Sequence, residues 1–228
     1  MKVVIQCAGK KSKDAGSFRL KDGRKVIFVA SPSAELPQGN NAYTRPDDMT
    51  DTGHETWREK LVAYNRVDTS KNPLNLFPAY KLYMNSAYQR LVSAFGEDKI
   101  FILSAGWGLI PAHFLTPLYD ITFSASSDPL NRRKPQDHYK DFSLMEDDGE
   151  AIAFLGGKSY LPLFLTLTGG MSGQKTIFYS SQTTPHQSSS NIKMIRFKTS
   201  TRTNWHYECA HALAEVIRGI IVGRLVKN

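Results

Sequence analysis

Short apolar runs separated by helix-like segments are the feature that most constrains how this chain can fold. Residues 3–5, 100–103 and 151–155 are runs of this kind and contain no polar residue. Runs that lack polar alternation are typical of strands whose two faces are both covered. Segments with helical periodicity lie between them, and such alternation indicates a mostly parallel sheet with helices on both faces. The sequence therefore predicts an α/β fold, arranged as a three-layer α/β/α sandwich.

The rest of the chain fits this architecture. Further strands are predicted at 176–179 and 193–197. Apolar residues at helical spacing predict helices over residues 54–66, 85–95, 137–146, 159–167 and 204–225. Residues 31–53 are polar and interrupted by proline and glycine, so we expect a long insertion loop there. A chain of 228 residues with this pattern is expected to form a single domain.

The composition narrows the class of protein. No stretch approaches the roughly 18 consecutive apolar residues of a membrane span. The first apolar run is too short for a signal peptide. The cysteines, Cys7 and Cys209, are too few to build a disulfide framework. We therefore expect a soluble, cytoplasmic protein with free thiols and no membrane partner.

The charge balance indicates the kind of partner. The formal net charge is +8 at pH 7, which attracts polyanions over long range. Nucleic acid is the commonest such partner, with an anionic membrane surface or plain solubility as the alternatives. We expect DNA as the partner and predict no obligate protein partner.

Ligands of open α/β sheets bind beyond the carboxyl ends of the strands, which ranks the loops of this chain. The segment directly after the first strand combines small residues with two lysines, so a backbone could approach a phosphate or a polar base edge closely. The alternative is a solvated basic turn. The candidate substrate-binding residues here are Gln6, Cys7, Gly9, Lys10 and Lys11.

A second candidate segment follows the strand at 100–103. It contains Ser104, Gly106, Trp107 and Gly108, where two glycines leave room beside an aromatic ring that could stack on a base or sugar. The alternative is a tight turn whose tryptophan packs in the core. It is not the nucleophile elbow of a hydrolase, because Ile102 occupies the position two residues before the serine where that pattern needs glycine.

A third candidate is the pair Tyr119 and Asp120, which lies in apolar company. Burial and a nearby cation can tune such a carboxylate as a base or as a stabiliser of positive charge. The alternative is an aspartate that caps a helix or a turn.

Basic residues elsewhere are candidate contacts to DNA phosphates, with a solvated surface as the alternative. They are Arg132, Arg133, Lys134, Lys158 and Arg202. Lys158 belongs to a Gly-Lys-Ser sequence, but Ile152 stands where a P-loop has its first glycine. This departure disfavours a nucleotide-hydrolysing enzyme.

Taken together, these segments resemble a known group of domains. A strand followed by Cys-small-Gly-Lys-Lys, and later a strand followed by Ser-Ala-x-aromatic-Gly-Leu and Tyr-Asp, is similar to the YaaA-type peroxide-stress proteins and to the core domain of archaeosine synthase. The resemblance covers roughly a quarter of the chain. It implies a fold like that of uracil-DNA glycosylases. It marks the following residues as functional: Cys7, Gly9, Lys10, Lys11, Ser104, Gly108, Tyr119 and Asp120.

Within this group the chain most resembles phage-defence DNA glycosylases that act on glucosylated hydroxymethylcytosine. Relatives often carry lysine before the aromatic residue, where this chain has Gly106. We expect the missing side chain to open space for a bulkier base.

The resemblance implies cleavage of an N-glycosidic bond in phage DNA as an antiviral defence, on a nucleotide flipped out of the duplex. In this mechanism Trp107 or Tyr119 stacks on the base, and Gln6 and Ser104 contact its polar edges. Asp120 stabilises the oxocarbenium-like sugar and orients water. We expect no metal ion and no organic cofactor. The alternatives are a base-exchange or base-modifying enzyme acting on a deazapurine nucleotide, and a non-catalytic DNA-binding stress protein.

Overall fold

The computed structural model describes residues 1–67, 71–134, 136–185, 190–201, 203–217 and 219. In this part of the chain a seven-stranded sheet forms the centre, in the order β12-β11-β10-β1-β5-β6-β9. The strands are β1 (Lys2–Gln6), β5 (Ile100–Ser104), β6 (Gly108–Pro111), β9 (Phe142–Ser143), β10 (Ile152–Leu155), β11 (Lys175–Tyr179) and β12 (Ile192–Arg196). All neighbours are parallel except β5 and β6, which are antiparallel.

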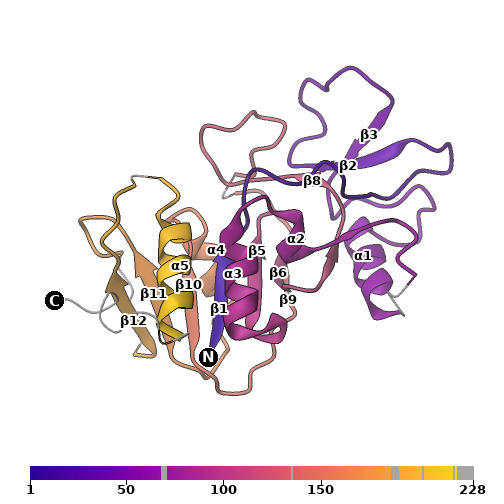
Figure 1. Cartoon of the computed structure of the whole chain (residues 1–228). Helices are drawn as coiled ribbons and strands as arrows, with labels where there is room; N and C mark the ends of the chain where they lie inside the picture. The colour runs from indigo at the N-terminus through magenta and orange to yellow at the C-terminus, as the bar shows by residue number, and fades with distance from the viewer. Residues whose placement is uncertain (68–70, 135, 186–189, 202, 218, 220–228) are drawn as a thin grey trace.

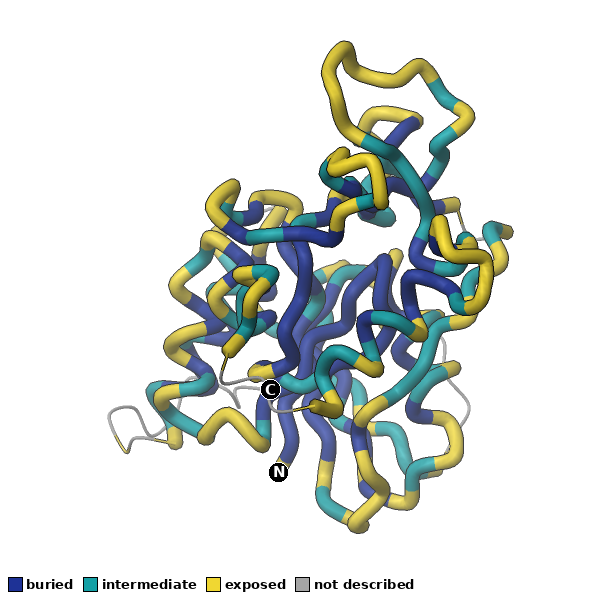
Figure 2. Tube along the Cα trace, turned by 90° about the vertical axis from the view of Figure 1, so that its right-hand side faces the viewer, coloured by how far each residue is buried: buried dark blue, intermediate teal, exposed yellow. Residues whose placement is uncertain are grey.

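Helices cover both faces of this sheet, which confirms the predicted α/β class and is compatible with the three-layer arrangement. The two long helices α3 (Ser86–Phe95) and α5 (Trp205–Ile217) pack side by side on one face, and α4 (Leu161–Thr168) lies on the other (Figure 1). The central strands are dark in Figure 2 because β1, β5 and β10 are buried almost throughout. Apolar runs without polar alternation require this double cover.

Smaller elements sit beyond the carboxyl edge of the main sheet. A three-stranded sheet in the order β3-β2-β8 stands above that edge in Figure 1. Its strands are β2 (Lys25–Val29), β3 (Asn41–Thr44) and β8 (Tyr119–Asp120), and a two-stranded sheet joins β4 (Phe77–Pro78) to β7 (Leu115–Thr116). The remaining elements are α1 (Trp57–Arg66), α2 (Ala79–Leu82) and the 3-10 helix Glu97–Lys99.

Local sequence signals explain where the helices begin. Thr56 and Glu59 form a reciprocal capping box at the start of α1. The Asn85 side chain accepts a hydrogen bond from the Ala87 backbone N–H at the start of α3. In the part of the chain that the structure describes, no helix is both long and apolar enough to cross a lipid bilayer.

Several predicted elements differ from those observed. The helix predicted over 137–146 is wrong, because this segment is extended and contributes β9 to the edge of the sheet. The long loop at 31–53 contains the short strand β3. The strand β6 was not predicted; it turns the segment after β5 into a hairpin. The last predicted helix corresponds to α5, and its expected continuation over 220–225 lies outside the described residues.

Candidate functional site

The strand order places a topological switch point between β1 and β10. From β1 the chain crosses to β5 through α3, whereas from β10 it crosses to β11 on the other side through α4. Such adjacent parallel strands leave a crevice at their carboxyl ends. The two strand ends are joined there by a hydrogen bond, because the Gly157 backbone N–H donates to Oε1 of Gln6 at 2.6 Å.

A polar cavity of about 570 Å³ opens at this point, and we call it the switch-point cavity. It combines residues from four separate parts of the chain. Its lining includes Gln6, Cys7, Gly9, Asp120, Thr122, Asn131, Gly157, Ser159, Tyr160, Asn204, Trp205, His206 and Tyr207. The structure thus brings the turn after β1 together with Asp120, as the sequence predicts, and adds residues that the sequence analysis did not single out.

Asp120 is held at the rim of this cavity by local backbone pairing. The strand β8 aligns Asp120 with Val29 of β2. The next residues pair with the segment that contains Asn131, which donates its Nδ2–H to Oδ2 of Asp120 at 2.8 Å. The sequence did not predict a role for Asn131, because it contacts Asp120 only after the loop between them folds back.

The charge state of Asp120 reflects two opposing effects. Partial burial raises the pKa of its carboxyl group, because the ionised form loses water, while the nearby Lys11 lowers it. The Lys11 ammonium lies 4.3 Å from the centre of the Tyr119 ring and donates to the Gly9 carbonyl oxygen at 3.4 Å. Burial lowers the pKa of Lys11 in turn. Asp120 itself is exposed and Lys11 is buried, so the main electrostatic feature of the site is a carboxylate at the cavity rim with a buried cation nearby.

The other residues of the first turn have different environments. Cys7 is buried, and its Sγ lies 3.3 Å from the hydroxyl of Tyr160 at the cavity wall. Gly9 and Lys10 are exposed. Gly9 has open space where a Cβ would stand, so the turn presents bare backbone to the cavity and the exposed Lys10 beside it.

The second predicted segment lies in the core instead. Trp107 is completely buried, and its ring packs edge-on against Phe28 with ring centres 4.9 Å apart. Tyr119 is 1% exposed. The prediction that Trp107 or Tyr119 stacks on a base is therefore wrong, because neither ring offers a free face. Ser104 is buried as well, so its predicted contact to a base edge is also wrong.

The two glycines of this segment are required by packing. A Cβ on Gly106 would lie 3.2–3.4 Å from the side chains of Ile121 and Tyr119, so the space expected there for a bulkier base is already filled. Gly108 has φ +88°, and a Cβ there would meet the Phe142 backbone at 2.4 Å. Its small size therefore permits the close pairing of β6 with β9.

Hydrogen bonds connect this buried segment to the cavity. Ser104 Oγ accepts from the backbone N–H groups of Gly106 and Trp107 at 3.2 and 3.1 Å, and it lies 2.8 Å from the Tyr119 hydroxyl. Because two N–H groups occupy the lone pairs of Ser104 Oγ, its own proton points to Tyr119. The Tyr119 hydroxyl also shares a hydrogen bond with the Tyr83 hydroxyl at 2.7 Å. These hydrogen bonds fix Tyr119, which is next to Asp120. Tyr119 and Ser104 are therefore positioning residues.

Two buried arginines hold the same hairpin turn from outside. Arg133 donates to the Ala105 carbonyl oxygen at 2.8 Å and pairs with Asp141. Arg58 donates to the Gly106 carbonyl oxygen at 3.0 Å and pairs with Asp47. The prediction of Arg133 as a phosphate contact is therefore wrong, since its guanidinium is buried and already paired.

The other predicted phosphate contacts stay on the surface. Arg132 and Lys134 line a smaller cavity of about 400 Å³, which shares Ser159 with the switch-point cavity. Lys158 is exposed on the loop after β10. Arg202 lies outside the described residues.

His206 and Tyr207 bring the start of α5 to the cavity. Burial lowers the pKa of His206 to about 4, so its imidazole is neutral at pH 7. Tyr207 is partly exposed, and its ring lies 4.0 Å from the His206 ring between centres. It is an aromatic residue at the cavity of the kind expected of Trp107 from the sequence. The helical pattern predicted α5 itself but not which of its residues reach the cavity.

Comparison with known proteins gives no family for this chain. The sequence matches no protein-family model and no protein in a search of curated sequences.

Proposed function

We propose that this protein is a DNA glycosylase that hydrolyses the N-glycosidic bond of a modified cytosine. The observation that carries the proposal is the Asp120 carboxylate, fixed by Asn131 at the rim of the switch-point cavity with the Lys11 ammonium nearby. The cavity volume of about 570 Å³ falls within the range of ligand sites and accommodates one nucleotide. A nucleotide can enter it only after it is flipped out of the base stack.

Asp120 performs the electrostatic part of the reaction. As the bond between the sugar C1′ and the base nitrogen breaks, positive charge develops on the sugar, and the adjacent carboxylate stabilises it. Asp120 also orients the water whose oxygen bonds to C1′. The bonding electrons leave with the base, whose nitrogen takes up a proton, and the water loses one proton as its oxygen bonds to C1′. Burial raises the pKa of Asp120, and the positive charge of Lys11 offsets part of that rise, so Lys11 favours the ionised carboxylate.

Residues of the cavity wall recognise the base. Oε1 of Gln6 is occupied by the Gly157 N–H, which fixes the amide so that its NH₂ group can donate to a carbonyl or ring nitrogen. The ring of Tyr207 takes the stacking role. Lys10, Arg132, Lys134 and Lys158 hold the flanking phosphates, in keeping with the net charge of +8.

The proposed substrate is phage DNA that carries glucosylated hydroxymethylcytosine, and the proposed role is antiviral defence. The support is the resemblance of the two strand-end segments and of the Tyr119-Asp120 pair to glycosylases of this kind. Both elements of the resemblance that lie in the cavity, the turn after β1 and Asp120, are close together in the structure.

The direct test is incubation of the purified protein with glucosylated phage DNA and, separately, with unmodified DNA. We expect free modified base, detected by mass spectrometry, and abasic sites, detected by alkaline cleavage, from the modified DNA only. Release of no base from either DNA, with binding retained, would contradict the proposal. It would then favour base modification or a non-catalytic binder. Incorporation of an added deazapurine base would identify base exchange.

A further inference from the structure

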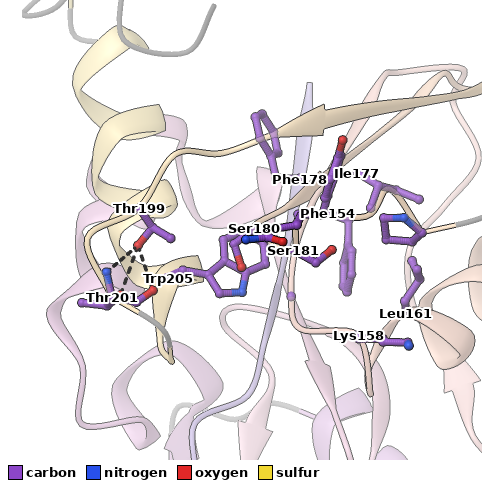
Figure 3. A pocket seen from close by; sticks show the side chains of 14 residues that line it. Phe154, Lys158, Leu161, Ile177, Phe178, Ser180, Ser181, Thr199, Thr201 and Trp205 are labelled. Atoms are coloured by element: carbon purple, nitrogen blue, oxygen red, sulfur yellow. Dashed lines mark hydrogen bonds between the residues drawn. The ribbon is translucent and has the colours of Figure 1, made fainter.

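A second cavity of about 660 Å³ lies beside the switch-point cavity, and we call it the side cavity (Figure 3). It opens at the carboxyl ends of β10 and β11. Its walls come from Phe154 of β10, from the residues that follow β11, and from the segment that leads into α5. Apart from Lys158 at its edge, the mechanism described above uses none of the described residues that line it.

The two cavities share their dividing wall. Trp205 lines both of them. On the loop after β10, Gly156 and Lys158 line the side cavity, whereas Gly157 and Ser159 line the switch-point cavity. Alternate residues of one short loop therefore face the two spaces. The two cavities therefore adjoin along this loop and at Trp205, so a large substituent on a base in the first cavity lies next to the second.

The lining of the side cavity combines aromatic rings with mostly uncharged polar groups. Among its described residues, Lys158 is the one charged side chain, and it lies at the edge of the close-up in Figure 3. The polar lining consists of Ser180, Ser181, Gln182, Thr199 and Thr201, and the apolar lining includes Phe154, Phe178 and Trp205. A phosphate is normally bound by several cations or a row of N–H groups, so this lining does not favour an anion.

Two of these polar groups are free to bind. The Ser180 hydroxyl and the Gln182 amide make no hydrogen bond to other described residues, whereas Thr199 is engaged with Thr201 and Glu208. Figure 3 shows the Trp205 ring reaching from the start of α5 toward Ser180. Neutral hydroxyl and amide groups beside aromatic rings suit a neutral, hydroxyl-rich ring, since its hydroxyls bond to the former and its C–H groups lie on the latter.

We propose that the side cavity is a subsite for a hexose carried by the target base. The inference rests on the proposed function, which it deepens: Asp120 acts on the sugar of the nucleotide, and the side cavity selects bases that bear a hexose. The wild-type protein then discriminates between bare and glycosylated hydroxymethylcytosine through a site remote from the reacting atoms.

The activity test uses two oligonucleotides of identical sequence, one with hydroxymethylcytosine and one with its glucosylated form. Ser180→Trp places an indole in the side cavity and is expected to lower kcat/KM for the glucosylated substrate at least about tenfold, a loss of about 1.4 kcal/mol. Cleavage of the bare substrate should stay within about twofold. Gln182→Ala is expected to cause a smaller loss in the same direction. Gln89→Ala, on the exposed side of α3, is the matched control.

A binding test separates this inference from the proposed function. Saturation-transfer NMR with free methyl glucoside, in both anomers, should show binding to the wild type and to Asp120→Asn. The signal should be lost in Ser180→Trp. Thermal melting checks that this variant is folded; if it is not, Gln182→Ala provides the test. If the wild type releases no base but binds the glucoside, the proposed function fails and the hexose subsite stands.

Two results would overturn the subsite. One is an equal loss of activity on bare and glucosylated substrates in Ser180→Trp, which means that the cavity contacts DNA generally. The other is the absence of glucoside binding to the wild type together with unchanged discrimination in both variants.

Discussion

The turns after β1 and β5 leave the same edge of the same sheet, yet only the first of the two lines the switch-point cavity. The turn after β1 leads into a long crossover, and its neighbour β10 sends the chain to the other side, so a crevice remains. The turn after β5 folds back at once into antiparallel β6. Its backbone is covered and clamped by Arg58 and Arg133.

The comparison teaches that the carboxyl end of a strand is a necessary condition for a site in this fold but not a sufficient one. The connection that follows the strand decides whether the edge stays open. The turn after β5 still supports the turn after β1, because Ser104 fixes Tyr119, which is the residue that precedes Asp120. Four experiments test this division of roles.

The largest effect is expected at the clamp. Arg133→Met leaves the buried Asp141 carboxylate without its partner and should lower the free energy of unfolding by about 3–5 kcal/mol. For a chain of this size the melting temperature then falls by roughly 10 °C. The salt dependence of DNA binding should not change. Lys134→Ala removes the exposed cation next in the sequence. It should leave the free energy of unfolding unchanged and reduce the salt slope of DNA binding by about 1. Unchanged stability and a reduced salt slope in Arg133→Met would instead indicate that Arg133 contacts DNA.

The next effect is expected in the open site. Asp120→Asn keeps the shape of the side chain but removes its charge, so base release should fall by about 10²–10³-fold. DNA binding, measured by fluorescence anisotropy, should change little. Asp128→Asn is the matched control, because Asp128 lines the same cavity and its carboxylate caps the Leu130 backbone N–H. An equal loss of base release in the two variants would contradict the proposed role of Asp120 in stabilising the sugar cation.

A third experiment tests the electrostatic link within the open site. The reaction needs ionised Asp120, so activity is lost as the pH falls through the pKa of that group, which lies above its ordinary value. Lys11→Met removes the charge that lowers this pKa, and the acid limb of the pH–rate profile should move to higher pH. The rate at its plateau should fall about tenfold, as expected for about 1.4 kcal/mol of lost stabilisation. An acid limb that does not move would separate Lys11 from Asp120.

The smallest effect is expected in the covered turn. Trp107→Phe leaves a small void beside Phe28 and should cost about 1 kcal/mol of stability. The Trp107 Nε1 has no hydrogen-bond partner among the described residues, so no polar contact is lost. Base release and DNA affinity should stay within about twofold of the wild type. A large loss of affinity in a protein of unchanged melting temperature would place Trp107 against the substrate after all.

The sequence by itself determined the parts of this protein that local periodicity encodes. Apolar runs without alternation marked β1, β5 and β10, and helical spacing marked α1, α3 and α5. The strand-end rule placed the turn after β1 among the candidate loops, together with the loops after β5, β10 and β11. These signals are local, because the conformation of a strand or helix depends on neighbours within a few positions.

Tertiary structure alone decided which of these strand ends stays open. Asn131 reaches Asp120, and Arg58 reaches the turn after β5, only through contacts between segments far apart in the chain. Trp107 has the aromatic side chain of a stacking residue, but the β5–β6 hairpin buries it. Such outcomes depend on how the helices and strands pack against one another. The hydrophobic periodicity of the sequence does not predict that packing.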